Sequence, residues 1–342
     1  MFDKDVPRRL LHIFDVPEVL PSGMPIAIFS QIEHQLAFGH TVFSLNYWPQ
    51  TGSAQKLADF IARAPVRPEI VSSWHEIAGK VHRWGETLDE IYIHGLWNRS
   101  ALTTLCLAAP LRAKVRHAPH GALDPAALQF GYLKKQLAWH VVQKWALVQA
   151  GCVVATSARE YDGIRRRLPR AKIDIVPLIL PAIQPAPAPL GPRKRLLYFG
   201  RIHPIKGIEA ILQAWHDIHL LLPDWDLALI GPQEEPWFSQ FTKMANTLKL
   251  PRVSFHPEVM PDRRLEVLAT ANLVLAPSQT ENFGLVIAEA RALGRTVVAS
   301  EQTGWRAEPG LVLFSGPSGL KDAILLEAQK AALLTAPTRD GA

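Results

Sequence analysis

Two glutamates, Glu281 and Glu289, have a spacing and a setting that could serve a ligand carrying both hydroxyl and phosphate groups. Glu289 lies in an apolar run that begins at Gly284, predicts a buried helix and stops at Gly294, a residue suited to a left-handed helix end. A carboxylate in such a place is costly unless hydroxyls or amides hydrogen-bond to it. Glu281 precedes the helix, where free backbone amides attract anions. The pair therefore predicts a sugar-phosphate site; the alternative is that Glu289 reaches solvent and Glu281 only caps the helix.

A turn with two cations lies upstream, in the segment GRIHPIKG that spans Gly200–Gly207. It follows a strand-like run and precedes an amphipathic helical pattern that starts at Lys206. Arg201 can contact two phosphate oxygens at once, and Lys206 supplies a mobile point charge. Gly200 lets the chain leave the strand sharply, and Gly207 removes a side chain where a ligand could approach. The order matches neither a P-loop nor the dinucleotide G-x-G-x-x-G, so we expect phosphate recognition of another kind.

Strand-like runs alternate with helical segments in both halves of the chain, which predicts two Rossmann-like α/β domains with parallel sheets. These runs are LLHIF, HTVFSLN, EIYIHG, KVRHAPHG, CVVATS and KIDIVPL, then RLLYFG, WDLALIG, RVSFHP, ANLVLAPS and TVVAS. The Pro-rich residues 181–192 predict a stiff, extended linker between domains at residues 1–180 and 193–342. Because ligands of such sheets bind beyond the carboxyl ends of the strands, we expect the site in the cleft between the domains.

These motifs resemble those of retaining glycosyltransferase family 4, the group 1 glycosyltransferases that use nucleotide sugars and have the GT-B fold. The resemblance rests on GRIHPIKG, LALIGP and PSQTENFGLVIAEA, and extends from about residue 10 to about residue 306. In the first half HGLW, PHGALDP and ATSAREYDGI resemble bacterial members that build cell-surface polysaccharides and lipopolysaccharides. The resemblance implies two domains that face a central cleft, the first binding the acceptor and the second binding the nucleotide sugar.

The resemblance also implies a reaction, the transfer of a sugar from a nucleoside diphosphate to a hydroxyl of a glycan or lipid-linked acceptor with retention at the anomeric carbon. Glu289 would bind the ribose hydroxyls, and Glu281 would lie against the donor sugar. Cations and backbone amides would stabilise the charge on the leaving diphosphate. The implied nucleotide-sugar site contains Gly200, Asn282, Phe283, Gly284, Leu285 and Glu289, and the implied catalytic residues are His120, Arg201, Lys206 and Glu281. We expect no cofactor and no metal, because two fixed cations replace the metal and no Asp-x-Asp or His cluster offers a metal site.

Three residues of the first half are expected on the acceptor side. His120 follows the strand-like run KVRHAP, and the resemblance places a histidine there beside the transferred sugar or the acceptor. His94 stands at the analogous strand end one element earlier, and a purely structural role stays open for each histidine. Gly23 matches a glycine-rich acceptor loop, in which relatives often have two adjacent glycines and this chain has Ser22 and Gly23.

The net charge of +6 comes from the first half of the chain. Residues 1–180 hold 21 Lys and Arg against 15 Asp and Glu, whereas residues 181–342 hold 16 of each. The segment Pro125–Ala150 mixes lysines with large apolar residues at helical spacing. Two interpretations stay open for it, a contact with an anionic membrane and an ordinary amphipathic helix packed on the sheet. No nucleic-acid motif accompanies the charge, so we expect no nucleic-acid partner.

The remaining features are typical of a cytoplasmic enzyme. Cys106 and Cys152 lie in apolar surroundings without C-x-x-C spacing, as reduced thiols do. The amino terminus lacks the apolar run of a signal peptide, and no stretch reaches membrane-spanning length. Two other function classes stay open. One is a non-catalytic sugar-nucleotide-binding protein that regulates or scaffolds polysaccharide assembly, and the other is a nucleotide-dependent oxidoreductase, which the absence of G-x-G-x-x-G disfavours.

Overall fold

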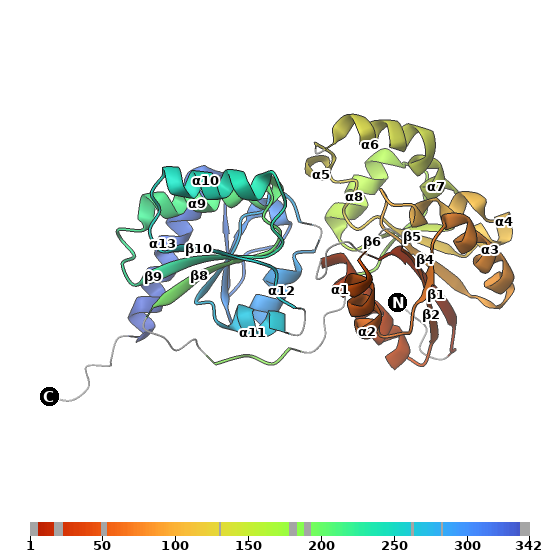
Figure 1. Ribbon diagram of the computed structural model, residues 1–342, viewed down its shortest axis with the longest axis horizontal. Coiled ribbons are helices and arrows are strands. Elements are labelled where there is room, and N and C mark those ends of the chain that lie inside the picture. Colours follow the sequence, from red (N-terminus) through yellow and green to blue (C-terminus); the bar gives the residue numbers. More distant parts are fainter. Residues whose placement is uncertain are drawn as a thin grey trace. The chain divides into compact units, whose positions relative to one another are not determined.

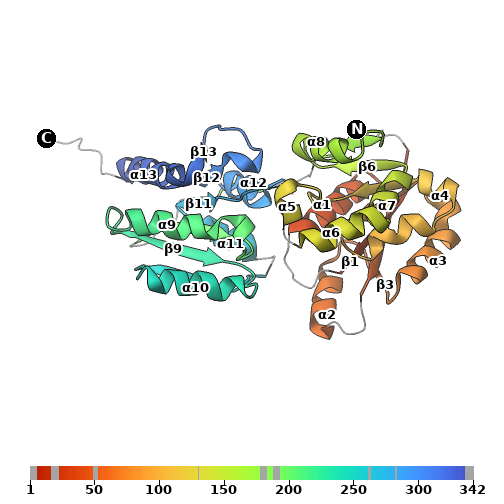
Figure 2. The same cartoon turned by 90° about the horizontal axis from the view of Figure 1, so that it is seen from above.

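The computed structural model divides into two compact units, residues 1–181 and 182–342, each built around its own parallel sheet (Figures 1 and 2). The described residues are 6–16, 23–48, 53–129, 131–177, 183–187, 193–260, 263–281 and 283–335. Two parallel-sheet α/β domains are the predicted fold class, and the structure confirms it.

The first unit has a seven-stranded sheet in the order β3-β2-β1-β4-β5-β6-β7, with every neighbouring pair parallel. Its strands are β1 Arg9–Asp15, β2 Thr41–Tyr47, β3 Glu69–Val71, β4 Glu90–His94, β5 Val115–Ala118, β6 Cys152–Ala155 and β7 Ile173–Ile175. Leu10 and Leu11 of β1 point to opposite faces of the sheet and belong to different apolar clusters. Burial on both faces explains why β1 reads as an almost continuous apolar run.

Helices cover the two faces of this sheet. They are α1 Gly23–Ala37, α2 Ala54–Arg63, α3 Trp74–Trp84, α4 Ala109–Ala113, α5 Pro125–Gln129, α6 Tyr132–Ala138, α7 Lys144–Gln149 and α8 Ala158–Arg167, with 3-10 helices η1 Gly85–Thr87 and η2 Ser100–Cys106 and a π-helical turn η3 Trp139–Gln143. Ile28 of α1 and Phe60 of α2 pack with Leu10, whereas Ile77 of α3 packs with Leu11 on the other side.

The second unit has a six-stranded parallel sheet in the order β10-β9-β8-β11-β12-β13. Its strands are β8 Lys194–Phe199, β9 Trp225–Ile230, β10 Val253–His256, β11 Leu273–Ala276, β12 Thr296–Ser300 and β13 Leu311–Phe314; its helices are α9 Ile208–Ile218, α10 Trp237–Thr247, α11 Arg264–Ala269, α12 Leu285–Ala292 and α13 Gly316–Thr335, with 3-10 helices η4 Pro204–Lys206 and η6 Glu301–Thr303. Figure 1 shows α9 and α10 on one face and α11 and α12 on the other.

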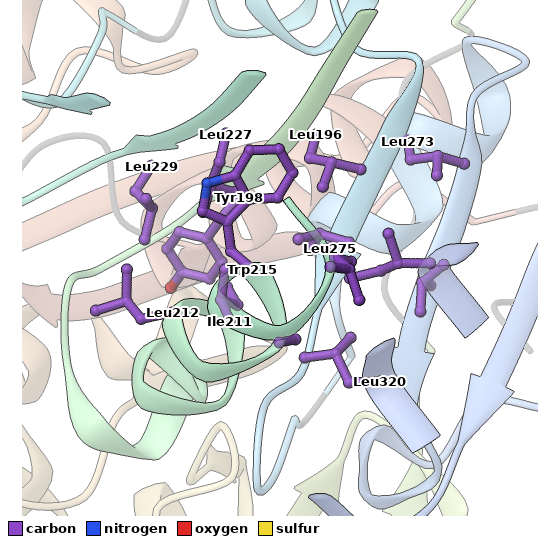
Figure 3. Close-up of a cluster of buried hydrophobic side chains, with 14 of the residues drawn as sticks. Leu196, Tyr198, Ile211, Leu212, Trp215, Leu227, Leu229, Leu273, Leu275 and Leu320 are labelled. Atoms are coloured by element: carbon purple, nitrogen blue, oxygen red, sulfur yellow. The ribbon is translucent and has the colours of Figure 1, made fainter. Parts of the chain in front are cut away.

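The largest apolar cluster of this unit lies between the sheet and α9, α10 and α13. Trp215 of α9 is fully buried there, beside Tyr198 of β8 and Leu227 of β9 (Figure 3). Leu320 of α13 belongs to the same cluster, so this last described helix packs on the sheet of its own unit. The cluster makes β8 and β11 rigid elements, and the loops that follow these two strands carry most of the predicted site.

Three sequence expectations about elements are corrected. The runs that form β3 and β13 were not recognised as strands, because each is a short strand at the edge of its sheet. The helix expected from Lys206 begins instead at Ile208, because Gly207 adopts φ 75° and separates η4 from α9. The apolar pattern predicts that the same helix reaches Leu222, but it ends at Ile218.

Part of the expected linker packs on the second unit. Residues 183–187 are neither helix nor strand, and the Ala186 amide donates to the Leu293 carbonyl oxygen at 3.2 Å. Arg295 Nη2 donates to the Ala186 carbonyl oxygen at 3.0 Å. The rest of residues 181–192 lies outside the described residues. Of the helices in the described ranges, none combines the length and the apolarity that crossing a membrane requires.

Candidate functional site

The loops that follow β8 and β11, two adjacent strands, meet through Lys206 and Glu281. Lys206 Nζ lies 2.5 Å from Glu281 Oε1, and Ser278 Oγ donates to the same oxygen at 2.8 Å. Each of the two charged side chains is 20% exposed. The Gln279 amide donates to the Ile205 carbonyl oxygen at 2.9 Å, which ties the two loops together. The structure thus joins a predicted phosphate cation and a predicted sugar-binding acid in one ion pair, and Glu281 does not cap the helix.

Arg201 belongs to the same loop but has another partner. Its Nη1 lies 3.1 Å from Glu234 Oε1, in the loop after β9, and its side chain is 45% exposed. The Tyr198 hydroxyl donates to the Arg201 carbonyl oxygen at 2.7 Å. Burial, with the nearby Glu281 charge second, raises the pKa of Tyr198, so this hydroxyl keeps its proton. Sequence reasoning missed Glu234, although its position two residues after the LALIGP segment was a signal.

Gly207 is required for a reason other than the one the sequence suggested. Its φ of 75° lies in the left-handed region, and a Cβ there would come within 2.3 Å of the Pro277 carbonyl oxygen. The space that a side chain of residue 207 would take is therefore filled by the loop after β11. Gly200 follows β8 as expected, and a Cβ on it would lie 2.8 Å from the Tyr198 hydroxyl.

The amino terminus of α12 follows Glu281. Gly284 is its N-cap at φ 71°, and no side chain within the described ranges caps the helix. Trp305 Nε1 donates to the Phe283 carbonyl oxygen at 2.8 Å, and a Cβ at Gly284 would lie 2.8 Å from that nitrogen. Trp305 thereby holds the turn in which Phe283 and Gly284 lead into Leu285. The partial positive charge of a helix start favours an anion at this place. Asn282 lies outside the described residues.

Glu289 is buried within α12, as predicted, and the solvent-exposed alternative is wrong. It forms an ion pair with Arg264 of α11, whose side chain is equally buried. Burial raises the pKa of Glu289 to about 7, although Arg264 acts to lower it. Burial likewise lowers the pKa of Arg264. Sequence reasoning missed Arg264; the available signal was its position four residues before Leu268, on the apolar face of a short helix.

In the first unit, His94 and His120 are in direct contact. His94 ends β4, His120 follows β5, and these strands are neighbours. His94 Nδ1 lies 2.9 Å from His120 Nε2, and His94 Nε2 lies 2.9 Å from Nδ1 of His12 in β1. His12 Nε2 lies 2.8 Å from Gln35 Oε1 of α1. The structure therefore brings the two predicted histidines together and adds His12 and Gln35, which sequence reasoning missed although LLHIF places a histidine inside an apolar strand.

These rings are neutral at neutral pH. Burial lowers the pKa of His12 and of His120 to about 4. Burial lowers the pKa of His94 well below its usual range, and the neighbouring histidines contribute to this. His117 on β5 is also buried with a pKa of about 4, and its Nε2 lies 2.9 Å from the Gly95 carbonyl oxygen. Neutral imidazoles have one donor and one acceptor nitrogen each, so the chain of contacts has a direction.

The turn that carries His120 is left-handed at two consecutive residues. His120 has φ 53° and Gly121 has φ 76°, and the left-handed region costs a non-glycine residue about 1–2 kcal/mol. Glu160 of α8 holds the turn by accepting from the Gly121 amide at 2.5 Å and from the Thr156 amide at 2.8 Å. Its spacing after the helix cap Ser157 matches a capping box, a signal that the sequence offered.

A small pocket of the first unit lies beside this turn. It is lined by Gln31, His34, Gln35, His120, Thr156 and Pro177, among others. Gly23, the predicted acceptor-loop residue, opens α1, which carries Gln35 near its other end; Ser22 lies outside the described residues. No group of three or more His, Cys, Asp or Glu side chains that could hold a metal ion occurs in the ranges that the structure describes.

Two family models match consecutive parts of the chain, "Glycosyl transferase 4-like domain" at residues 22–178 and "Glycosyl transferases group 1" at residues 193–332. The D-inositol 3-phosphate glycosyltransferase of Rhodococcus jostii (strain RHA1) is 28% identical over 274 residues, which are 73% of this chain and 54% of that protein. The chain thus spans about half the length of the curated relatives it matches.

Solved structures match over nearly the whole chain. Sucrose-phosphate synthase from Thermosynechococcus elongatus has a TM-score of 0.73 at 19% identity, with 95% of this chain and 90% of that chain covered. Anabaena Alr3699/HepE in complex with UDP and glucose has a TM-score of 0.69 at 16% identity, with 96% and 100% covered. With both family models matched in sequence and both sheets matched in space, the chain belongs to the group 1 glycosyltransferases and has their GT-B fold.

Proposed function

We propose that the protein transfers a sugar from a nucleoside diphosphate to a hydroxyl group, with retention at the anomeric carbon. One observation carries the proposal, the pairing of Lys206 with Glu281 at 2.5 Å directly before the uncapped start of α12. A cation and a helix start attract a diphosphate, and a carboxylate accepts from sugar hydroxyls. The UDP and glucose bound by the structural relative support this class of donor.

The ion pair is the resting state of the donor site. Both side chains are partly exposed, so a diphosphate competes with Glu281 for Lys206 Nζ. Once Lys206 turns to phosphate, the Glu281 carboxylate is free to accept from hydroxyls of the donor sugar. Arg201 reaches the diphosphate in the same way, by exchanging Glu234 for phosphate oxygens. Lys206, Arg201 and the α12 amides then stabilise the negative charge that grows on the leaving diphosphate.

Glu289 is proposed to recognise the ribose. Its pairing with Arg264 keeps the carboxylate in one position inside α12, where a ribose hydroxyl can reach it from the same strand ends. In the first unit, His120 is proposed to contact the donor sugar or the acceptor hydroxyl. The Glu160 contacts that hold its left-handed turn support a site role, because a strained residue persists only where its surroundings fix it.

The acceptor is proposed to be a glycan or lipid-linked molecule of polysaccharide or lipopolysaccharide synthesis, presented at the inner face of the membrane. An apolar stripe on α6, η3 and α7 supports a membrane surface. Its members Leu133, Leu137, Val141 and Trp145 are spaced by four residues and are 51–80% exposed. Trp139 and Leu147 of the same segment are buried, so it packs on the sheet with one face and presents the other. The buried face fits the interpretation as an amphipathic helix packed on the sheet, and the exposed face supports the proposed contact with a membrane.

A thermal-shift screen with UDP, GDP and ADP, and with their sugars, tests the donor site. Ligand at about a hundred times its dissociation constant adds roughly 2.7 kcal/mol to stability. The matching nucleotide sugar is then incubated with and without acceptor lipids, glycans and, as the names of the relatives suggest, inositol phosphates. Transfer, or slow hydrolysis without acceptor, supports the enzyme. Tight binding without any turnover would instead favour a non-catalytic sugar-nucleotide-binding protein.

A further inference from the structure

The first unit contains a chain of hydrogen bonds of which the reaction above uses only the outer end, His120. It runs from Gln35 on α1 through His12 on β1 and His94 on β4 to His120 in the turn after β5. The three inner residues are at most 1% exposed, whereas His120 is partly exposed and lines the pocket. Polar side chains here occupy positions across three neighbouring strands that apolar side chains would otherwise fill. Their presence therefore indicates a role beyond packing.

The orientation of the Gln35 amide, with Oε1 toward His12, gives the chain its direction. Gln35 Oε1 can only accept, so His12 Nε2 carries a proton and donates at 2.8 Å. The neutral His12 then accepts at Nδ1 from His94 Nε2, and His94 accepts at Nδ1 from His120 Nε2, each at 2.9 Å. All three rings are thus in the Nε2–H form. Nδ1 of His120 keeps its lone pair and has no hydrogen-bond partner within the described part of the chain.

We propose that Gln35, His12 and His94 are positioning residues that hold His120 in its neutral Nε2–H form and thereby reserve Nδ1 as an acceptor for a substrate hydroxyl. The assignment of a hydroxyl-bearing substrate rests on the proposed function; the tautomer assignment does not. An acceptor nitrogen at a fixed position selects a ligand that donates, such as a sugar or acceptor hydroxyl, over a ligand that can only accept.

The surroundings of the chain favour neutral rings. The Tyr92 ring stacks on His12 with ring centres 4.7 Å apart, and Phe14 meets the His94 ring edge-on at 6.0 Å. His117 lies near His94 and disfavours a charge on it, and His34 lines the pocket beside His120. The lowered pKa values of the three rings agree with this setting.

Nitrogen NMR of the ¹⁵N-histidine-labelled 342-residue chain tests the proposal without an activity assay. In the wild type at pH 7, the His120 signals are expected to show a protonated Nε2 and an unprotonated Nδ1, with no titration between pH 6 and pH 8. Assignment uses the His120→Asn variant, since the chain has 13 histidines. If His120 carries its proton on Nδ1, the Gln35 amide is reversed, the chain runs in the opposite direction, and the proposal is overturned.

Two substitutions at Gln35 separate positioning from packing. Gln35→Leu removes the acceptor and is expected to give mixed tautomers at His12, His94 and His120. Gln35→Glu keeps an acceptor oxygen and is expected to preserve the Nε2–H form. His117 is the internal control, because its Nε2 donates to the Gly95 carbonyl oxygen and does not depend on Gln35. An unchanged His120 tautomer in Gln35→Leu would show that Gln35 does not set it.

The rate of transfer is expected to depend on the tautomer of His120. Gln35→Leu is expected to lower kcat/KM for transfer about tenfold, because a loss of this size corresponds to one neutral hydrogen bond. The affinity for the bare nucleoside diphosphate is expected to stay unchanged. Gln35→Glu is expected to restore most of the loss. If the wild type binds no nucleotide sugar, the proposed function fails while the NMR result still stands. If turnover is normal in Gln35→Leu although the tautomers are mixed, the positioning role fails and the proposed function stands.

Discussion

At the scale of single residues, the two glutamates of one motif differ in their surroundings. Glu281 is partly exposed and shares an oxygen between Lys206 and Ser278, so a ligand can displace its partners. Glu289 is buried against Arg264, and its carboxylate is confined. The sequence motif predicted that both acids belong to a ligand site. It could not predict their partners, because Arg264 and Lys206 come from other elements and meet the acids only in the folded chain.

The difference predicts separable binding defects. Glu289→Gln is expected to weaken the binding of nucleoside diphosphate about tenfold, with or without an attached sugar, because one hydrogen bond to the ribose is lost. Glu281→Gln is expected to leave the bare nucleotide bound normally or slightly tighter, since Lys206 loses a competing carboxylate. Its defect appears only with the sugar attached. Calorimetry of both variants with both ligands measures this, with the exposed Glu266→Gln on α11 as the control. Equal losses with both ligands would contradict the division of roles.

Glu289 also predicts a pH dependence of stability. Its pKa is raised from 4.5 in the unfolded chain to about 7 in the fold, so between these values the folded state binds the additional proton. Stability therefore falls as pH rises through this window, by up to about 1.4 kcal/mol per pH unit. Denaturant unfolding at pH 5, 6 and 7 should show this slope in the wild type and a smaller slope in Glu289→Gln. Equal slopes in the two proteins would show that Glu289 does not cause the pH dependence of stability.

At the scale of elements, the pattern of alternating strands and helices predicted most of both sheets, because buried parallel strands are long apolar runs. The pattern did not predict the short edge strands β3 and β13. The pattern also did not predict where α9 starts, because the position of Gly207 is set by contact with the loop after β11. A periodic pattern contains no information about such a contact between distant loops.

That contact can be tested by adding a single methyl group. Gly207→Ala is expected to lose about 2–4 kcal/mol of stability, because the left-handed backbone and the 2.3 Å approach of the Pro277 oxygen both oppose a Cβ. Gly294→Ala is the matched control, with the same φ of 75° and nothing within 4 Å of its Cβ. Its loss should be limited to the backbone, about 1–2 kcal/mol. Denaturant midpoints give both values. An equal loss in the two variants would show that the Pro277 loop moves aside without a loss of stability.

The exposed stripe on α6, η3 and α7 gives a second prediction at this scale. The wild type should sediment with vesicles that contain anionic lipid, and the double variant Leu137→Ser with Trp145→Ser should bind at least tenfold more weakly. Added salt should weaken the binding, because neighbouring lysines contribute. Leu220→Ser with Leu221→Ser removes comparable exposed apolar side chains from the second unit and serves as the control. Equal binding by the two double variants would show that the stripe is not the membrane surface.

At the scale of the whole molecule, each unit contributes a different part of the proposed chemistry. The second unit carries the cations, the two acids and the α12 start at the carboxyl ends of its strands, as the rule for parallel sheets predicts. The first unit carries a neutral histidine chain that reaches the ends of β4 and β5. Sequence reasoning could place His94 and His120 at those ends, but His12 and Gln35 are polar residues inside apolar patterns, and only the packing of α1 on the sheet brings them together.

The central claim is that a nucleoside diphosphate binds at the carboxyl end of β8 through Lys206. Calorimetry with the nucleotide selected by the thermal-shift screen tests it in Lys206→Ala and in Lys194→Ala. Lys206 lies in η4 after the carboxyl end of β8, and Lys194 is the first residue of that strand. The two side chains are 20% and 21% exposed, and each is paired with one carboxylate. Lys206→Ala should weaken binding roughly 10- to 150-fold, since a charge-assisted contact contributes about 1.5–3 kcal/mol, and Lys194→Ala should bind like the wild type. Wild-type affinity in Lys206→Ala, or the same loss in both variants, would contradict the account.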